Sequence, residues 1–261
     1  MMYEFCAQTD QGLVRNNNED AVAVDSNTGL CLLADGMGGY NAGEVASAMA
    51  VSFLHQELTA WLSRDGSQAS SRELRRNIEA CVAHANHSIF SAACSNPDHA
   101  GMGTTLVAGV FMENRLMLCH IGDSRCYRLR GHVLQQITKD HSLLQEQVDA
   151  GLMTAEQALE SPHRNLITRA LGVEDAVRVE INEHRVEPGD FYLLCSDGLS
   201  DMVLDTVIES ILNYPGTLPQ KAAALVREAN DSGGRDNVSV VLVHAAAGES
   251  RRGLLSRMLG K

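Results

Sequence analysis

The sequence has no Cys-x-x-Cys pair, although it contains 7 cysteines. This absence argues against a zinc knuckle and against a thioredoxin-type redox site. Three of the cysteines, Cys31, Cys119 and Cys195, stand inside apolar runs, where a free cysteine behaves as a small hydrophobic residue. This usage predicts a reducing compartment, and we expect a cytoplasmic protein.

Long apolar runs and a basic leader are also missing. The N-terminal segment, MMYEFCAQTD, has no basic region followed by an apolar stretch, so no signal peptide is expected. No apolar run approaches the ~20 residues of a membrane-spanning helix. The sequence therefore predicts no membrane span.

Positive charge is scarce. The 261 residues include 21 Lys and Arg against 33 Asp and Glu, a net charge of −12. Non-specific binding of nucleic acid needs a basic face, so no nucleic-acid partner is expected. Residues 245–261 differ because they contain four basic residues, and we expect a short, flexible C-terminal tail there.

Two periodicities alternate along the chain. Helical spacing covers 43–62, 70–93, 201–212 and 217–231. Strand-like runs occupy 20–25, 30–34, 104–112, 115–121, 125–130, 133–137, 191–195 and 238–244. Connections of hairpin length, Glu113-Asn114 and Arg130-Gly131, separate some of these strands. The pattern predicts antiparallel sheets with helices packed outside them, and the polar segment 142–166 is interpreted as an inserted flap.

Acidic residues stand repeatedly at the ends of the strand-like runs. A single Asp-Gly after a strand usually marks only a turn. Here, however, several strand ends share the feature, and strand ends at one side of a fold lie close together. Converging carboxylates repel one another unless cations lie between them. The acids placed in this way are Asp35, Asp123 and Asp197 after such runs, and Glu19, Asp20 and Asp236 before them.

The type of donor predicts the metal. Carboxylates without His or Cys at ligand-like spacing favour Mg²⁺ or Mn²⁺ over Zn²⁺. Glycine after Asp35 and Asp197 allows a sharp turn and can bring a main-chain carbonyl to a metal. Arg15, at the entrance to the strand that begins at Asp20, can bind a phosphate through two parallel hydrogen bonds. We therefore predict a two-metal site that acts on a phosphoryl group.

Eight short motifs occur in a fixed order along the chain. They are RNNNED (15–20), ADGMGG (34–39), GMGTT (101–105), GDSR (122–125), KDHS (139–142), TRALG (168–172), SDGLSD (196–201) and RDNVSV (235–240). Their order and spacing resemble the bacterial branch of the metal-dependent Ser/Thr protein phosphatases, the protein phosphatase 2C family. The resemblance covers about residues 3–244 as one catalytic domain and leaves only the tail, 245–261, outside it.

The resemblance implies an α+β fold, a four-layer α-β-β-α sandwich in which two antiparallel β-sheets are flanked by helix pairs. Two metals would lie in a cleft at one end, bridged by Asp35. Asp197 and Asp236 would complete the first metal site. The segment 142–166 corresponds to the family's mobile flap, which influences substrate access.

The other site residues follow from the same resemblance. The carbonyl of Gly36 would help to form the second metal site, where Glu19 and Asp20 would act mainly through bound waters. Asp123 would hold a weaker third metal shared with Asp197. Arg15 would bind the substrate phosphate.

The implied activity is hydrolysis of phosphoserine and phosphothreonine in proteins by a hydroxide that bridges two Mn²⁺ or Mg²⁺ ions. The hydroxide would attack phosphorus in line, without a phosphoenzyme. The implied partners are phosphorylated proteins, including a Ser/Thr protein kinase, and we expect a monomer. Eukaryotic relatives carry a His two residues after the bridging Asp, where this chain has Met37. The general acid is therefore unassigned, with a metal-bound water and His141 as candidates.

Three other interpretations of the sequence compete with this one. Cys119 and Arg125 match the Cys-x5-Arg signature of cysteine-dependent phosphatases, whose phosphate loop opens onto a helix. Here the loop would contain Asp123, and an alternating hairpin follows it, so Cys119 is interpreted as a core residue. A catalytically inactive pseudophosphatase would lack a metal acid, and none of the matched acids is missing. A nucleotide site at GMGG fails because no Gly-Lys-Ser/Thr follows.

Overall fold

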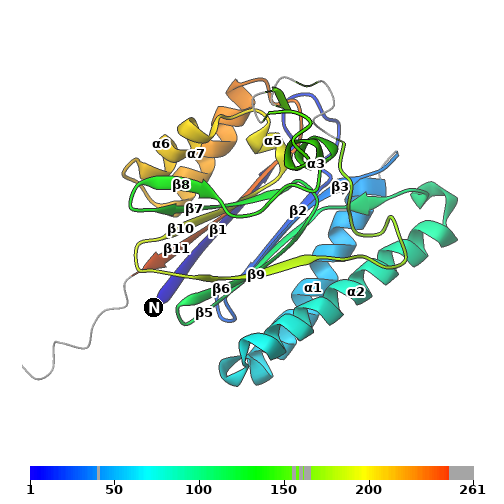
Figure 1. Ribbon diagram of the computed structural model, residues 1–261, viewed down its shortest axis with the longest axis horizontal. Helices are drawn as coiled ribbons and strands as arrows, with labels where there is room; N and C mark the ends of the chain where they lie inside the picture. The colour runs from blue at the N-terminus through cyan, green and yellow to red at the C-terminus, as the bar shows by residue number, and fades with distance from the viewer. Residues whose placement is uncertain (40–41, 155–156, 159–160, 162–165, 247–261) are drawn as a thin grey trace, which may run out of the picture.

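The strands form two antiparallel sheets that pack face to face (Figure 1). The structure is a computed structural model that describes residues 1–39, 42–154, 157–158, 161 and 166–246. The first sheet has the strand order β1 (Met2–Asp10), β11 (Val238–Ala246), β10 (Phe191–Cys195), β7 (Arg125–Arg130) and β8 (Val133–Gln136). The second has the order β2 (Asp20–Asp25), β3 (Leu30–Met37), β5 (Leu106–Met112), β6 (Arg115–Ile121) and β9 (Glu180–Arg185), and the short β4 (Gly103–Thr104) pairs with β3.

Helices cover the outer face of each sheet, which gives the four layers predicted. The long helices α1 (Ala42–Asp65) and α2 (Ser71–Ser95) pack on the second sheet. The helices α5 (Asp197–Ser200), α6 (Asp205–Asn213) and α7 (Leu218–Asp231) pack on the first. Figure 1 shows the two groups of helices on opposite sides of the paired sheets.

Three apolar layers hold the sandwich together. Alternate residues of one strand serve different layers: Leu32 packs toward α1 and α2, whereas Leu33 packs between the sheets. On the first sheet, Leu193 faces α5–α7 and Leu194 faces the second sheet. Burial on both faces explains why these strands are continuous apolar runs rather than alternating ones.

Local sequence signals begin the helices. Ser70 and Glu73 form a capping box at the start of α2, and Thr217 and Gln220 form one at the start of α7. Each box satisfies backbone N–H groups that the first helical turn leaves without partners. Two short 3₁₀ helices, Gly66–Gln68 and Pro97–His99, precede and follow α2.

Some predicted boundaries were wrong. The β7–β8 connection is Gly131-His132 rather than Arg130-Gly131, because Arg130 pairs with Val133 across the hairpin and both connecting residues have positive φ. The predicted helix 201–212 corresponds to α6, which begins later, at Asp205, and the short α5, which ends at Ser200, was not predicted. The structure also adds two strands that were not predicted, β1 and β9.

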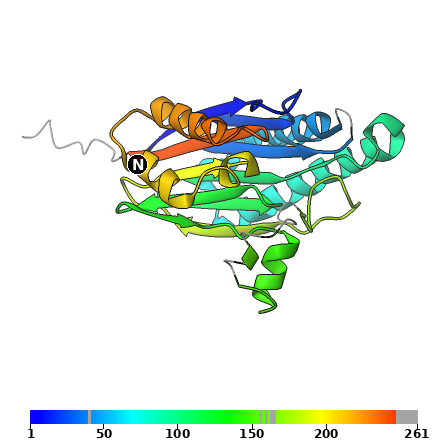
Figure 2. The ribbon, with the colours of Figure 1, turned by 90° about the horizontal axis from the view of Figure 1, so that it is seen from above.

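The segment predicted as a flap contains α3 (Leu143–Asp149), which stands out from the body of the domain in Figure 2. Its base is closed by a bridge between Ser142 and Ile167. Residues 155–156, 159–160 and 162–165 of the flap, and residues 247–261 of the predicted tail, lie outside the described residues.

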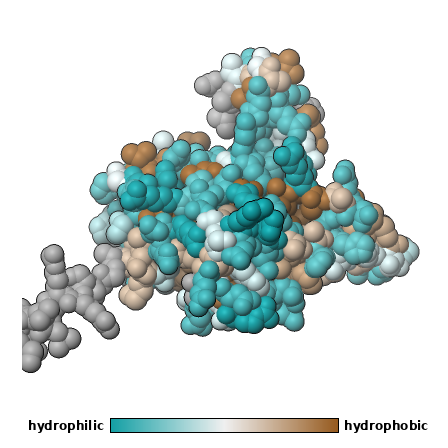
Figure 3. All heavy atoms as spheres, turned by 60° about the horizontal axis from the view of Figure 1, so that its bottom comes forward, coloured by the Kyte–Doolittle hydropathy of each residue, from teal (hydrophilic) through white to brown (hydrophobic). Residues whose placement is uncertain are grey.

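The surface seen in Figure 3 is largely hydrophilic, with apolar groups in small, separate patches. Exposed apolar residues of the described chain, such as Leu13, Leu152 and Leu204, are far apart in sequence. Among the described residues, no helix combines the length and apolar character needed to cross a membrane.

Candidate active site

Strand pairing brings the first two predicted acids together. Asp20, the first residue of β2, is the cross-strand partner of Asp35 near the end of β3. Glu19 comes just before them, and its carbonyl accepts a 3.0 Å hydrogen bond from the Gly36 N–H. The second sheet therefore holds Glu19, Asp20, Asp35 and Gly36 at one end.

The first sheet contributes the remaining acids at the same end of the sandwich. Asp197 begins α5 directly after β10, and Asp236 lies just before β11. Asp123 lies where the chain crosses from β6, in one sheet, to β7, in the other. Antiparallel pairing of β10 with both neighbours places these three chain segments side by side.

Direct hydrogen bonds join the two sheets at this point. The Ser196 hydroxyl donates to Asp20 Oδ2 at 2.8 Å, and the Ser239 N–H donates to the Ser196 hydroxyl at 3.0 Å. The Asn237 side-chain oxygen accepts from the Glu19 N–H at 2.8 Å. The acids from both sheets thus form one cluster with fixed geometry.

Without a bound cation, it is electrostatically unfavourable for the carboxyl groups of this cluster to be ionised. Burial, followed by repulsion from Asp20, Asp197, Asp123 and Asp236, raises the pKa of Asp35 well above its usual range. Burial and repulsion from neighbouring acids raise the pKa of Asp197 in the same way.

The two flanking acids are affected similarly. Burial raises the pKa of Asp20 to about 6, although hydrogen bonds from Ser239 and Ser196 oppose the change. Burial and the charge of Asp140 raise the pKa of Asp123 to about 6, and Asp201 adds to the effect. Each of these shifts measures a cost of holding negative charge at this site.

The residues present fit divalent cations. Asp20 Oδ1 is buried, with no hydrogen-bond partner among the described residues. A buried carboxylate oxygen without a donor is costly to desolvate, and a cation removes that cost. Clustered carboxylate oxygens are the donor set that Mg²⁺ and Mn²⁺ prefer.

The glycines after the two central acids have a different role from the one predicted. Gly36 continues β3, and Gly198 lies inside α5, so neither makes a sharp turn. A Cβ on Gly36 would overlap the carbonyl oxygen of Gly43, and one on Gly198 would overlap the carbonyl oxygen of Asn237. Both are therefore glycine because another backbone approaches closely.

Arg15 lies beside the acids, as its predicted role requires. Its Nη2 is 2.6 Å from Asp236 Oδ2, and its side chain is 50% exposed. Half of the Arg15 side-chain surface is therefore open to solvent, and Asp236 fixes the position of the guanidinium.

Several functional side chains were missed by the sequence analysis. The backbone of Asp35 is held by two buried threonines: Thr105 Oγ1 accepts from its N–H at 3.0 Å, and Thr104 Oγ1 donates to its carbonyl at 2.8 Å. Thr105 Oγ1 also lies 2.8 Å from Ser124 Oγ, next to Asp123. The GMGTT and GDSR motifs carry these residues, but a hydroxyl in a motif does not by itself reveal its partner.

The structure contradicts the cysteine-dependent alternative. Cys119 is fully buried against α1 and α2, and burial raises its thiol pKa to about 12. Arg125 begins β7 in the other sheet, where it binds Asp140 with Nη2–Oδ2 at 2.7 Å. A thiolate and a phosphate-binding arginine are therefore not assembled at this motif.

His141 is also unsuited to act as the general acid. Its Nδ1 accepts a hydrogen bond from the Gly122 N–H at 3.2 Å, and its Nε2 is buried 3.7 Å from Glu180. Burial, followed by the neighbouring His120 and Arg169, lowers its pKa to about 4. Met37, at the end of β3, has no acidic proton, so the general acid stays unassigned.

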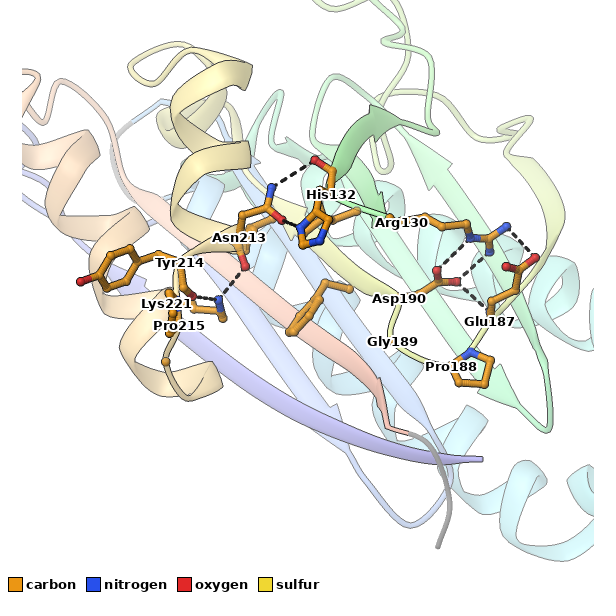
Figure 4. A pocket seen from close by; sticks show the side chains of 15 residues that line it. Arg130, His132, Glu187, Pro188, Gly189, Asp190, Asn213, Tyr214, Pro215 and Lys221 are labelled. Atoms are coloured by element: carbon orange, nitrogen blue, oxygen red, sulfur yellow. Dashed lines mark hydrogen bonds and ion pairs between the residues drawn. The ribbon is translucent and has the colours of Figure 1, made fainter. Parts of the chain in front are cut away.

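A separate hollow of about 630 Å³ lies at the opposite end of β7 and β10 (Figure 4). None of the predicted site residues lines it. Its charged groups are paired internally, with Arg130 bound to Asp190 at 2.7 Å and Lys221 bound to the Leu212 carbonyl at 2.6 Å. The convergent acids, rather than this hollow, are the candidate site.

Known proteins share both the sequence and the fold. The family model described as protein phosphatase 2C matches residues 13–232. A serine/threonine phosphatase, stp, of Listeria monocytogenes is 40% identical over 242 residues, covering 90% of this chain and 93% of that protein. The serine/threonine protein phosphatase PstP of Mycobacterium tuberculosis is 44% identical over 243 residues, covering 93% of this chain and 45% of that protein.

Solved structures agree. The crystal structure of Mycobacterium tuberculosis PstP/Ppp superposes with a TM-score of 0.87 at 42% identity, covering 95% of this chain and 100% of that one. A PstP catalytic domain in complex with two manganese ions has a TM-score of 0.82 at 41% identity, covering 94% of this chain and 99% of that one. On the evidence of its sequence, its fold and its converging acids, this chain belongs to the protein phosphatase 2C family.

Proposed function

We propose that this protein hydrolyses phosphoserine and phosphothreonine in phosphorylated proteins, using Mn²⁺ or Mg²⁺ ions held by its converging acids. The observation that carries the proposal is the convergence of carboxylates from both sheets at one end of the sandwich, where Asp20 Oδ1 is buried with no hydrogen-bond partner among the described residues. Burial and mutual repulsion there raise the pKa of Asp35 and of Asp197. A cluster that repels its own charge in this way is suited to bind cations. The relatives named as serine/threonine phosphatases, and the PstP domain with two manganese ions, support the same conclusion.

Each acid has a proposed part in holding the ions. Asp35 would bridge two ions, and the charges of four other acids, two of which would complete the ion sites, all act on it. Asp197 and Asp236 would complete one site, and the Gly36 carbonyl would contribute to the other. Glu19 and Asp20 would orient water around that second site.

Asp123 would hold a third ion with Asp197. The repulsion that Asp123 exerts on Asp197 supports this pairing, since Asp123 is the charge that acts most strongly on that residue.

The chain's own groups bind and orient the substrate. Arg15, anchored by Asp236, would donate hydrogen bonds to the phosphate oxygens and offset the charge that develops on them. When bound, a pair of divalent ions lowers the pKa of water and withdraws electron density from phosphorus. The Thr105 hydroxyl holds the backbone of Asp35, and the Ser196 hydroxyl holds the Asp20 carboxylate.

The setting of the enzyme is also part of the proposal. Substrates would include a Ser/Thr protein kinase, and residues 3–244 would form the catalytic unit, with 142–166 as its flap. All 7 cysteines are free, which supports a reducing, cytoplasmic location. The expected monomeric state stays a prediction.

Hydrolysis of a phosphothreonine peptide by the purified protein tests the proposal. We expect activity that is lost on complete chelation and returns when Mn²⁺ is added. Activity that survives chelation would remove the metal site from the mechanism. A folded protein that is inactive with every divalent ion would indicate a binding module instead.

A further inference from the structure

His141 holds the turn that carries Asp123 through a matched pair of hydrogen bonds. Its backbone N–H donates to the Gly122 carbonyl at 2.9 Å. Its side-chain Nδ1 accepts from the Gly122 N–H at 3.2 Å. Both polar groups of Gly122, the residue before Asp123, are therefore bound by one residue.

The same residue closes the base of the flap. The His141 carbonyl accepts from the Thr168 N–H at 2.8 Å, and the next pair along, Leu143 to Leu166, is also 2.8 Å. These bonds flank the bridge between Ser142 and Ile167. His141 is thus the first residue of the short ladder from which the flap extends.

Surrounding contacts fix the imidazole ring. It is stacked on His120, with ring centroids 4.8 Å apart and an angle of 12° between the planes. His120 is itself held by a 2.9 Å contact between its Nε2 and the Lys139 carbonyl. Both residues are more than nine-tenths buried, at 1% exposure for His120 and 7% for His141.

The hydrogen-bond pattern decides the tautomer of His141. Because Nδ1 accepts from an amide N–H, the neutral ring carries its proton on Nε2. His120, His141 and Glu180 offer ligand atoms within 4.8 Å of one another. A metal bound at His141 Nε2 would need a lone pair there, and metal-bound histidines donate rather than accept with their other nitrogen. This cluster is therefore a support and not a metal site.

Hydrogen bonds also connect the Asp123 turn to the residues that hold Asp35. Ser124, directly after Asp123, shares a 2.8 Å hydrogen bond with Thr105, whose hydroxyl accepts from the Asp35 N–H. The Asp123 turn is thus held on one side by the residues that fix Asp35 and on the other by His141. The His141 side connects to the base of the flap.

We propose that His141 is a positioning residue that couples the base of the flap to Asp123, through the acceptor Nδ1 and the Gly122 peptide. The proposal rests on the proposed function, in which Asp123 holds the weakest-bound metal ion.

Two variants of His141 distinguish the effect of losing the Nδ1 acceptor from the effect of losing the imidazole ring. In His141→Asn, the amide oxygen can occupy the place of Nδ1 and accept from Gly122. In His141→Gln, the oxygen falls near the place of Nε2 instead. Both variants lose the stacking on His120, so the difference between them isolates the Nδ1 acceptor.

The first readout is Mn²⁺ binding, titrated by the electron paramagnetic resonance signal of free Mn²⁺, with Asp123→Asn as the reference. We expect Asp123→Asn to lose the weakest Mn²⁺ site. His141→Gln should weaken that site by about fivefold, the size expected for one hydrogen bond, and His141→Asn should stay within about twofold of wild type. Equal effects of Asn and Gln, or no site that depends on Asp123, would overturn the proposal.

The second readout needs neither activity nor metal. In the wild-type protein, ¹⁵N-resolved imidazole spectra should show His141 protonated on Nε2 only, and a proton on Nδ1 would overturn the proposal. Amide exchange of Gly122 and Thr168 in the metal-free protein should accelerate in His141→Gln and not in His141→Asn. If the peptide assay shows no phosphatase activity but these differences appear, the proposed function fails while the structural clamp stands.

Discussion

At the scale of single residues, Asp35 is buried and is repelled by four neighbouring acids, which raises its pKa well above the usual range. We expect Asp35→Asn to reduce phosphopeptide hydrolysis to the level of the chelated wild-type enzyme, because it removes the central charge that holds the ions. The amide also relieves the repulsion that raises the pKa of Asp35, so the metal-free variant should melt no lower than metal-free wild type. Near-normal turnover by folded Asp35→Asn would refute the proposed site.

For Cys119 we expect the opposite of Asp35: a substitution that lowers stability and leaves turnover nearly unchanged. The residue is fully buried among apolar side chains, so Cys119→Ser places a hydroxyl where no partner is near and should cost about 1–3 kcal/mol of stability. Turnover should nevertheless stay within about twofold of wild type, because the thiol has no chemical role. Cys119→Ala is the matched control without the hydroxyl. Urea unfolding and peptide hydrolysis together check the prediction, and a folded but inactive Cys119→Ser would restore the cysteine mechanism.

The sequence predicted the acids better than the groups that position them. Each acid follows or precedes an apolar run, so its place at a sheet end could be inferred. Ser196 and Thr105 have no comparable signal, because their partners, Asp20 and Asp35, come from strands distant in the chain. The pairing of Arg15 with Asp236 likewise spans 221 residues.

At the scale of elements, the strands that contribute buried residues to the core were predicted most accurately. The runs 20–25, 115–121, 125–130 and 191–195 match β2, β6, β7 and β10 residue for residue, and the last three contribute to the buried layers. The missed strands β1 and β9 are edge strands whose polar residues interrupt the alternation. Edge strands are specified largely by their partner: β1 pairs with β11 over nine consecutive positions.

The contact between α7 and the end of α6 leads to a prediction about the stability of these two helices. Lys221 of α7 is 6% exposed, and its ammonium donates to the carbonyls of Leu212 and Tyr214 at the end of α6. Lys221→Met keeps the volume but leaves both carbonyls without this donor, so we expect a loss of about 1–3 kcal/mol in urea unfolding. Because the hollow in Figure 4 is at the opposite end of β10 from Asp197, turnover of the folded variant should not change.

A control for this contact is Tyr214→Ser, since the Tyr214 side chain is largely exposed. Its effect on stability should stay within about 0.5 kcal/mol. If Lys221→Met were as mild as Tyr214→Ser, the lysine would not stabilise the end of α6. If it lowered turnover in proportion to stability, the two ends of the sandwich would be coupled.

At the scale of the whole molecule, the acid cluster makes stability depend on pH and on metal. Asp20 and Asp123 have pKa values raised to about 6, whereas an unfolded Asp titrates near 3.9. Between about pH 4 and pH 6 the folded chain therefore keeps protons that the unfolded chain has released. By linkage, the free energy of unfolding of the metal-free protein falls as pH rises through this range.

Asp35 and Asp197 extend the loss to higher pH, because their pKa values are raised further. His141 acts in the opposite direction: its lowered pKa, about 4, favours the folded state above the ordinary histidine pKa and less so as pH falls. Burial also lowers the pKa of His184, which acts in the same direction as His141, so two histidines oppose four carboxyls and the carboxyls set the sign. Bound Mn²⁺ reverses it, since protons and metal compete for the same oxygens.

Thermal unfolding at pH 5, 6, 7 and 8, with chelator and with saturating Mn²⁺, measures both effects. We expect the metal-free midpoint to fall from pH 5 to pH 8, and the increase in the midpoint caused by Mn²⁺ to grow over the same range. Asp35→Asn should flatten both trends, because it removes one of the repelling charges and the central ligand together. A metal-free midpoint that rises with pH would mean that these carboxyls do not share a repulsive site, and it would remove the electrostatic reason for metal binding here.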